Sequence, residues 1–407
     1  MGSSPSTFGP VAHRERIASV DVVRGFALWG VLLINMFNVG GAWDPHWTGP
    51  GDRFAVWAAE LIFEQKSWTL FSFLFGFSFS LQMIRAEERS APFLRVYTRR
   101  LLLLFGFGIL HSFFYGGDIL GRYAILGFVL LLFRRLPSKG LLVLTALLLL
   151  IGPIQQTIPT WSDPETETAL AQASTRAEDL DDDQAWMRAI ERVPDVIRQR
   201  VTLAWQLDRF RGRWDGSESW PTWFAMFLLG LYAGKRRVFD ERNRAFVRRV
   251  FVWGLPLGIV TMTILSVIPT EYATVWGRIG SELAFPVSRT ALAMSYAAGL
   301  VLLMQYSRWQ RILSPLGAMG RTALTVYVSH SIIFSTLFHA YGFGLAFRVG
   351  PAGIFGYAAL IYAVQLAICV WWMNRFEFGP LEWVWRTLTY RKLQPMRQSG
   401  GVIRPTT

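Results

Sequence analysis

The chain has 407 residues, of which 52% are hydrophobic and only 17% are charged. Eighteen tryptophans and 31 phenylalanines with so few charges exceed what the surface of a soluble protein tolerates. The single cysteine, Cys369, excludes a disulfide framework and a cysteine-based metal site. The net charge of +13 would suggest nucleic acid only if the basic residues formed one solvated face. Since such residues also flank membrane helices, we expect no nucleic-acid partner.

Apolar stretches that approach or exceed the length needed to cross ~30 Å of hydrocarbon recur along the chain. They predict an all-α polytopic membrane protein in contact with the lipid bilayer. We expect about ten transmembrane helices, at residues 22–40, 66–84, 101–115, 119–133, 140–158, 220–234, 248–268, 283–305, 322–340 and 352–373. The third and fourth stretches are short and nearly adjacent, which predicts a tight helical hairpin. An amphipathic segment near residues 54–62 is expected to lie on the membrane surface.

The distribution of Lys and Arg among the loops predicts the orientation of these helices. Short loops rich in Lys and Arg alternate with short loops that contain few of them. This alternation holds throughout if both termini lie in the cytoplasm, so we expect a multi-pass protein of the cytoplasmic (inner) membrane. The first stretch is not expected to be a cleaved signal peptide, because it contains Asp21 and Arg24 and lacks a cleavage site.

The hydropathy pattern divides the chain into four parts. Residues 1–158 form an N-terminal membrane half, and residues 220–390 form a C-terminal membrane half. Between them, residues 159–219 are polar and acidic, which predicts an extracytoplasmic loop with one or two amphipathic helices. Residues 391–407 predict a disordered cytoplasmic tail.

Polar side chains share one face of the first predicted helix. At 100° per residue, Asp21, Arg24 and Asn35 lie on the same face, and Asp21 and Arg24 are close enough to pair. One interpretation is a neutralised pair that anchors the helix at the cytoplasmic interface. The other is a buried pair facing a ligand cavity, which Gly25 and Gly30 favour because they permit close helix packing. Ionisable groups inside membrane spans are functional candidates, since their burial is costly.

The third predicted helix has arginines at its inner end and a histidine near its outer end. Arg100 and His111 are eleven residues apart and therefore share a face. Arg99 and Arg100 suit an anionic ligand arriving from the cytoplasm, and they equally suit anionic lipid headgroups. His111 is either a packed, hydrogen-bonded residue or a group that transfers protons, with Asp118 placed to orient its imidazole.

Other polar residues give weaker signals. His46 lies in an aromatic loop outside the membrane and is a second candidate base. Arg289 could pair with Glu282, seven residues before it in the eighth helix. Arg321 is expected to begin the ninth helix, in which His330 lies near the middle. No P-loop, GxSxG, HExxH or dinucleotide motif occurs, and no metal site is predicted.

Several motifs in a fixed order resemble the YeiB family of bacterial membrane proteins. They are Asp21-x-x-Arg24-Gly25-Phe-Ala-Leu-x-Gly30-x-Leu-x-x-Asn35, Lys66-x-x-x-Leu70-Phe71-Ser72-x-Leu74-Phe75-Gly76, Arg99-Arg100-Leu with Gly108-x-x-His111, Gly117-Asp118-Ile119-Leu120-x-x-Tyr123-x-x-x-Gly127, Gly320-Arg321-x-Ala323-Leu324-Thr325, and Gly379-Pro380-x-Glu382-Trp383-x-Trp385-Arg386-x-Leu388-Thr389-Tyr390. The last two resemble the domain of unknown function associated with this family. The resemblance covers nearly the whole chain except residues 159–219 and both tails.

The YeiB family is similar to a larger group of membrane acyltransferases, which includes the lysosomal heparan glucosaminide acetyltransferase and the acyltransferase-3 proteins. This similarity implies transfer of an acyl group from a cytoplasmic acyl-CoA, such as acetyl-CoA, to an acceptor on the far side. In the heparan enzyme, a similar helix is followed by a loop with the catalytic histidine, which implies that role for His46. The chain departs from acyltransferase-3 proteins at Asn35, where they often have His. It departs from the YeiB family at Val326 and His330, where Asn and Gln are usual.

The expected donor is an acyl-CoA that acts as a co-substrate, with no tightly bound cofactor. Arg99 and Arg100 are the expected ligands of its phosphates, and Arg134 and Arg135 are further candidates. Arg289 is an additional candidate for donor binding, because orientation alone does not account for an arginine inside the eighth helix.

His111 is the expected general base on a hydroxyl or amine of a small or glycan acceptor, with Asp118 setting its tautomer. Arg24 or Asn35 is expected to stabilise the thioester oxygen as negative charge develops. A transporter or lipid-handling protein that uses the same polar residues is the alternative. A third hypothesis is a partner-binding protein that acts through residues 159–219. A homo-oligomer is compatible with all three.

Overall fold

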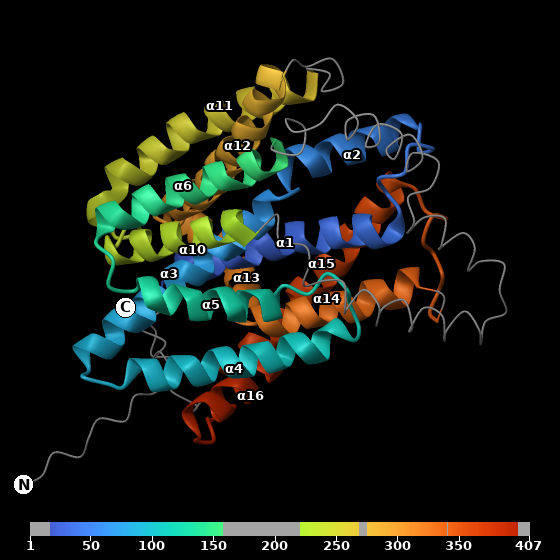
Figure 1. The fold of residues 1–407 in the computed structure, drawn as a ribbon. Coiled ribbons are helices and arrows are strands. Elements are labelled where there is room, and N and C mark those ends of the chain that lie inside the picture. Colours follow the sequence, from blue (N-terminus) through green and yellow to red (C-terminus); the bar gives the residue numbers. More distant parts are fainter. Residues whose placement is uncertain (1–16, 158–219, 268–274, 340, 398–407) are drawn as a thin grey trace, which may run out of the picture.

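The computed structural model describes residues 17–157, 220–267, 275–339 and 341–397 (Figure 1). Within these ranges the chain is α-helical, and the β-type contact found there is an isolated bridge between Phe376 and Arg397. The predicted all-α class is therefore confirmed. The predicted extracytoplasmic loop at 159–219 lies outside the described residues.

The described chain contains thirteen α-helices and one short 3-10 helix. The α-helices are α1 (Ala18–Gly40), α2 (Pro50–Ile62), α3 (Lys66–Glu88), α4 (Phe93–Ser112), α5 (Leu120–Phe133), α6 (Ser138–Thr157), α10 (Trp220–Lys235), α11 (Arg244–Val267), α12 (Val275–Leu303), α13 (Ser307–Arg321), α14 (Ala323–Phe338), α15 (Pro351–Met373) and α16 (Pro380–Tyr390); the 3-10 helix is η3 (Glu241–Asn243). Each of the ten predicted apolar stretches overlaps one of these helices, and α2 covers the predicted amphipathic segment.

Five helical segments are long and apolar enough to cross a membrane. Within the described residues they are Ala18–Gly40, Pro50–Glu88 (α2 and α3 with the turn between them), Glu241–Leu265, Leu283–Leu303 and Pro351–Met373. Three shorter apolar helices accompany them, at Leu120–Phe133, Ser138–Ile151 and Ala323–Phe338. The polytopic membrane fold is thus supported directly by five helices, and the total of ten spans stays a prediction.

Two helices had no counterpart among the predicted elements. α13 and α16 follow the eighth and tenth predicted spans, where no helix was predicted. Arg321, expected to begin the ninth span, is instead the last residue of α13, and α14 begins at Ala323. Both unexpected helices are short and carry charged side chains, so neither has an apolar stretch as long as a membrane span.

α1 lies inside the bundle and α11 lies at its edge (Figure 1), and most of α15 is not buried. Most of α1 is buried, and it contacts α3, α12, α13, α14 and α15. By contrast, α11 and α15 present large apolar side chains outward, including Trp253 and Leu360. An apolar outer surface around a buried helix that carries Asp21 and Arg24 is the arrangement expected in hydrocarbon.

Glycines bring α1 and α13 into backbone contact. A side chain at Gly25 would overlap the carbonyl oxygen of Leu316, and one at Gly320 would overlap the carbonyl oxygen of Asp21. Such close approach requires residues without a Cβ at both crossing points. The crossing places the end of α13 beside Arg24, which positions the candidate site described below.

Glu382 of α16 caps the start of α14. Its buried carboxylate accepts hydrogen bonds from the Leu324 nitrogen at 2.6 Å, the Thr325 nitrogen at 3.1 Å and the Thr325 hydroxyl at 2.6 Å. These amides are among those that a helix leaves without an internal partner. Burial raises the pKa of Glu382, and the three donated hydrogen bonds oppose that rise. One carboxylate therefore holds α16 against α14.

We expect Glu382→Ala to destabilise the protein by about 3 kcal/mol, because two buried backbone amides and a hydroxyl lose their acceptor. Glu382→Gln should cost about 1 kcal/mol, since the amide oxygen still accepts from the backbone. Thermal unfolding of the detergent-solubilised protein measures both. A Glu382→Ala variant as stable as the wild type would show that the capping interaction contributes nothing.

Candidate functional site

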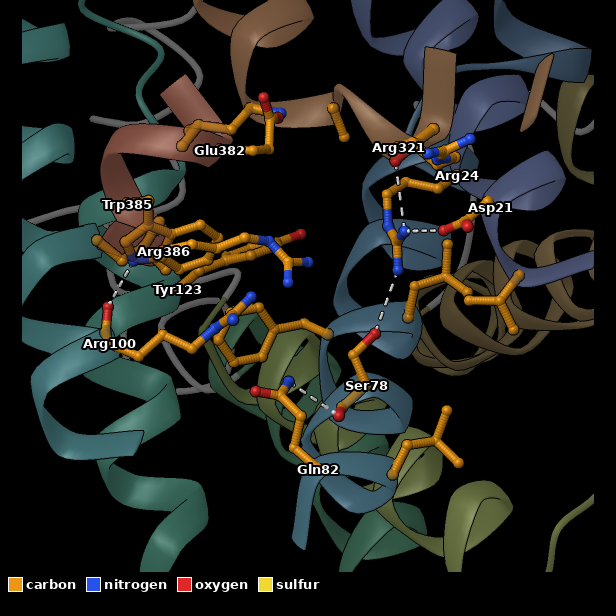
Figure 2. Close-up of a pocket in the computed structure, with 18 of the residues that line it drawn as sticks. Asp21, Arg24, Ser78, Gln82, Arg100, Tyr123, Arg321, Glu382, Trp385 and Arg386 are labelled. Carbon is orange, nitrogen blue, oxygen red and sulfur yellow. Dashed lines mark hydrogen bonds and ion pairs between the residues drawn. The ribbon is translucent and has the colours of Figure 1, made fainter. Parts of the chain in front are cut away.

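A cavity of about 290 Å³ lies between α1, α3, α4, α5, α13, α14 and α16 (Figure 2). Arginines dominate its charged lining: Arg24, Arg85, Arg89, Arg100, Arg321 and Arg386. The acidic residues of the lining are Asp21 and Glu382, and Glu382 is engaged with α14. The cavity is therefore strongly basic, which favours an anionic ligand.

The rest of the cavity wall is mainly apolar and aromatic. This part consists of Ile17, Val20, Phe71, Leu74, Phe75, Leu81, Tyr97, Leu101, Leu104, Ile119, Leu120, Tyr123, Ala323, Leu324, Tyr327 and Trp385. A cavity that combines several arginines with such a wall suits an amphipathic ligand with an anionic part and an apolar part.

Arg24 is fixed at one wall of the cavity by three acceptors. It donates to the Asp21 carboxylate at 2.6 Å, to the Gly320 carbonyl at 3.3 Å and to the Ser78 hydroxyl at 3.2 Å. The predicted Asp21–Arg24 pair is present, and both side chains line the cavity (Figure 2). This geometry matches the interpretation of a pair that faces a ligand cavity. The guanidinium is oriented before any ligand arrives.

Arg100 lies on the opposite wall, against α16 (Figure 2). Its guanidinium carbon lies 3.9 Å from the centre of the Trp385 ring, and the Trp385 indole donates to the Arg100 carbonyl at 3.0 Å. The neighbouring Arg99 instead donates to the Thr389 carbonyl at 2.8 Å and does not line the cavity. Of the two adjacent arginines predicted to bind a donor, only Arg100 lines the cavity.

His111 forms a buried chain of hydrogen bonds with Asp118 and Ser331. Its Nδ1 lies 2.8 Å from the Asp118 carboxylate, and its Nε2 lies 2.8 Å from the Ser331 hydroxyl. The Asp118 carboxylate also accepts from the Leu120 and Gly121 nitrogens at 3.1 and 2.9 Å. These amides begin α5, so Asp118 is held by a helix N-terminus and in turn fixes the imidazole.

This chain of hydrogen bonds adjoins the cavity without lining it. Tyr327, which does line the cavity, has its ring 4.9 Å from the His111 ring. Leu120, another lining residue, directly follows the Asp118 loop. The basic residues and the histidine are therefore parts of one region, separated by the Tyr327 side chain.

Four predicted site residues lie elsewhere, as do the further candidates Arg134 and Arg135, which do not line the cavity. The His46 side chain is 45% exposed and contacts Asp44 in the loop after α1. Asn35 is buried in α1, but it does not line the cavity. Arg289 of α12 lies against the Phe285 ring, and its predicted partner Glu282 has a side chain outside the described structure. Arg99 is the fourth. Among the described residues, no group of three or more His, Cys, Asp or Glu could hold a metal ion.

Comparison with known proteins assigns this chain to a family. Uncharacterized protein YxaH of Bacillus subtilis is 31% identical over 98% of this chain and 100% of its own length. Uncharacterized protein YeiB of Escherichia coli is 28% identical over 94% and 98%, respectively. The chain belongs to the YeiB family.

Other comparisons agree with this assignment. A family model described as a protein of unknown function (DUF418) matches residues 233–392. An uncharacterized 39.9 kDa protein from the amylase 3′ region of Bacillus acidopullulyticus is 28% identical over 95% of this chain and 97% of its own length. No solved structure matches the chain. In this YeiB-family protein, the cavity combines residues before the DUF418 match, such as Arg24 and Arg100, with residues inside it, such as Arg386.

Several residues of the site were missed at the sequence level. Arg85 and Arg89 were not distinguished from the other basic residues of the loops, and Arg321 was considered only as the start of the ninth helix. Arg386 and Glu382 entered only as family motifs. Ser331 gave no signal, because a serine in an apolar helix ordinarily bonds to its own backbone.

Proposed function

We propose that this YeiB-family protein is a membrane acyltransferase, which moves an acyl group from an acyl-CoA-type donor to a hydroxyl or amine acceptor. The observation that carries the proposal is one region in which an arginine-lined cavity ends beside a buried His111–Asp118 pair. A donor with phosphates and an apolar arm matches the first part. Proton transfer during acyl transfer requires the second.

Donor recognition in this proposal is electrostatic. Arginine binds phosphate oxygens through several donors at once, and partial exclusion of water strengthens these contacts. Arg24 and Arg100 face each other across the cavity, so both can contact one anionic group (Figure 2). The apolar wall then guides the thioester arm toward Tyr327 and His111. The predicted loop charges place the mouth of this cavity on the cytoplasmic side, where acyl-CoA is available.

Acyl transfer in this proposal depends on His111. Asp118 accepts a hydrogen bond from the Nδ1–H of His111, which leaves the lone pair on Nε2, beside the Ser331 hydroxyl, to take a proton from an attacking hydroxyl or amine. Arg100 and His111 are eleven residues apart on α4, which corresponds to a rise of ~16 Å. Donor binding near one end of α4 and chemistry near the other bring the acyl group well into the bilayer, toward an acceptor on the far side.

Purified protein in liposomes, supplied with radiolabelled acetyl-CoA and a panel of hydroxyl and amine acceptors, tests the proposal. We expect labelled acceptor together with thermal stabilisation of the protein by CoA. Absence of both would contradict the proposal. Stabilisation by CoA without labelled product would support the donor site and would show that the tested acceptors are not substrates.

The two adjacent arginines of α4 provide a matched test of donor binding. We expect Arg100→Gln to raise KM for acyl-CoA about tenfold or more, because it removes a charged contact with the donor. Arg99→Gln should keep KM within about twofold of the wild-type value, since the Arg99 side chain donates to the Thr389 carbonyl and not into the cavity. Steady-state kinetics at saturating acceptor measures both. Equal effects of the two variants would place the donor elsewhere.

The same cavity supports transport or lipid handling as a second candidate. Arginines beside an apolar wall also match the headgroup and chains of an anionic lipid. This alternative predicts flux of a labelled lipid or anion across liposomes without any covalent change in the cargo. The acyltransferase predicts a changed acceptor instead.

A further inference from the structure

Ser331, His111 and Asp118 are connected in the order nucleophile, base and orienting acid. The hydroxyl of Ser331 lies 2.8 Å from Nε2 of His111, and Nδ1 of the same ring lies 2.8 Å from Asp118. These are the separations expected when a base removes a proton from a serine and a carboxylate positions the base. The three residues come from α14, from α4 and from the loop before α5.

The surrounding hydrogen bonds define the direction of proton donation. The Asp118 carboxylate accepts hydrogen bonds from the Leu120 and Gly121 nitrogens, so it acts as an acceptor toward His111 as well. Nδ1 of His111 therefore donates to Asp118. The neutral imidazole then has a lone pair on Nε2, and the Ser331 hydroxyl donates to it. This is the protonation pattern needed to activate a serine.

A purely structural role for Ser331 would be its ordinary bond to the helix backbone. That bond exists, since the Ser331 hydroxyl lies 3.4 Å from the Tyr327 carbonyl. The hydroxyl has a single hydrogen, and the contact with His111 is 0.6 Å shorter (3.4 Å compared with 2.8 Å), which favours donation to the imidazole over donation to the carbonyl. Ser331 and His111 are both buried, which keeps water away from a reactive ester.

The basic cavity ends one helical turn from Ser331. Tyr327 lines that cavity, precedes Ser331 by four residues on α14 and packs against the His111 ring. Residues four apart lie on the same face of a helix. An acyl group bound against the Tyr327 side chain therefore lies one helical turn from Ser331.

We propose that Ser331 is a catalytic nucleophile that becomes acylated during turnover. The inference rests on the proposed acyltransferase function and divides it into two half-reactions. In the first, His111 takes the Ser331 proton, and Oγ attacks the thioester carbonyl carbon. The carbon–sulfur bond breaks, and the thiol leaves with the proton from His111. The product is an ester on Ser331.

The second half-reaction reverses the proton path. His111 takes a proton from the acceptor hydroxyl or amine, which attacks the ester carbonyl carbon. The bond to Ser331 Oγ breaks, and Oγ recovers the proton from His111. Since the acyl group waits on the protein, the donor and the acceptor need not occupy the site together. This property suits substrates that arrive from opposite sides of a membrane.

Mass spectrometry of protein incubated with acetyl-CoA in the absence of acceptor tests the inference. We expect one acetyl group on the wild-type chain, located at Ser331, and none on Ser331→Ala or His111→Asn. Ser329→Ala is the matched control, since Ser329 lies on the same helix and bonds to the Val326 carbonyl, and it should be acetylated like the wild type. Ser331→Cys should form a thioester, which shows that the altered site still folds.

Turnover and a fluorophosphonate probe separate failure of this inference from failure of the proposed function. Turnover of Ser331→Ala is expected to fall about a thousandfold. If this variant turns over at the wild-type rate, Ser331 is not the nucleophile and acyl transfer remains. If the wild type neither turns over nor reacts with the probe, both proposals fail. If the probe labels Ser331 in the wild type but not in His111→Asn, Ser331 is activated whatever the natural donor is.

Discussion

Replacing His111 by asparagine is expected to lower kcat for acyl transfer about a thousandfold. Asparagine is polar and smaller than histidine, so it fits between Asp118 and Ser331, but it cannot accept a proton during the reaction. The KM for the donor should change little, because His111 does not line the arginine-rich cavity. Stopped assays with radiolabelled acetyl-CoA measure both constants.

The same replacement at His46 decides between the two histidines proposed from the sequence. His46 is half-exposed and bonds to Asp44, away from the cavity and from Ser331. We therefore expect His46→Asn to retain activity within a few-fold of the wild type. A large loss at His46 with none at His111 would reverse the assignment. Thermal unfolding of both variants checks that any loss is not caused by misfolding.

Replacing Gly76 by leucine is expected to cost more than about 3 kcal/mol of stability and to prevent recovery of folded protein. Gly76 of α3 faces α10, and a side chain there would overlap the carbonyl oxygen of Phe227. The contact is reciprocal, since a side chain at Gly230 of α10 would overlap the carbonyl oxygen of Phe73. A backbone cannot yield as a flexible side chain does, so the two helices must separate.

Gly106 of α4 provides the matched control for this substitution. A Cβ atom at this position would have no packing neighbour within 4 Å. Gly106→Leu should therefore be neutral or slightly stabilising, because leucine favours a helix by up to about 1 kcal/mol relative to glycine. Size-exclusion profiles and melting temperatures in detergent compare the two variants. Similar losses at both positions would show that close contact between α3 and α10 is not required.

The helices themselves follow from local sequence, and the reason is physical. A span of apolar residues in hydrocarbon must satisfy its own backbone hydrogen bonds, and a helix does this within a single segment. Every predicted apolar stretch accordingly overlaps a helix. α13 and α16 were not predicted in this way because they are amphipathic. Their helical state depends on surfaces provided by α1, α4 and α14.

The local pairs of the site were also predictable. Asp21 and Arg24 are separated by three residues, which places both on one helix face. His111 and Asp118 are seven residues apart across a tight hairpin, so chain geometry alone keeps them near each other. Both contacts are present in the structure.

The distant members of the site depend on how the helices pack. Ser331 is separated from His111 by 220 residues, and Arg100 meets Trp385 across 285 residues. No periodicity in one segment specifies such a contact, because it depends on the crossing of separate helices. The glycine contact between α1 and α13 is an example, since it alone places the Gly320 carbonyl against Arg24.

The sequence by itself determined the class of the protein, its family and the basic character of its loops. These properties arise from composition, apolar length and local motifs, which need no knowledge of helix contacts. Only the tertiary structure decided which arginines converge on one cavity and which hydroxyl meets His111. The reason is that burial and side-chain direction are set by packing between helices that are remote in sequence. Several of the arginines expected to orient the membrane helices thus also gather around the cavity.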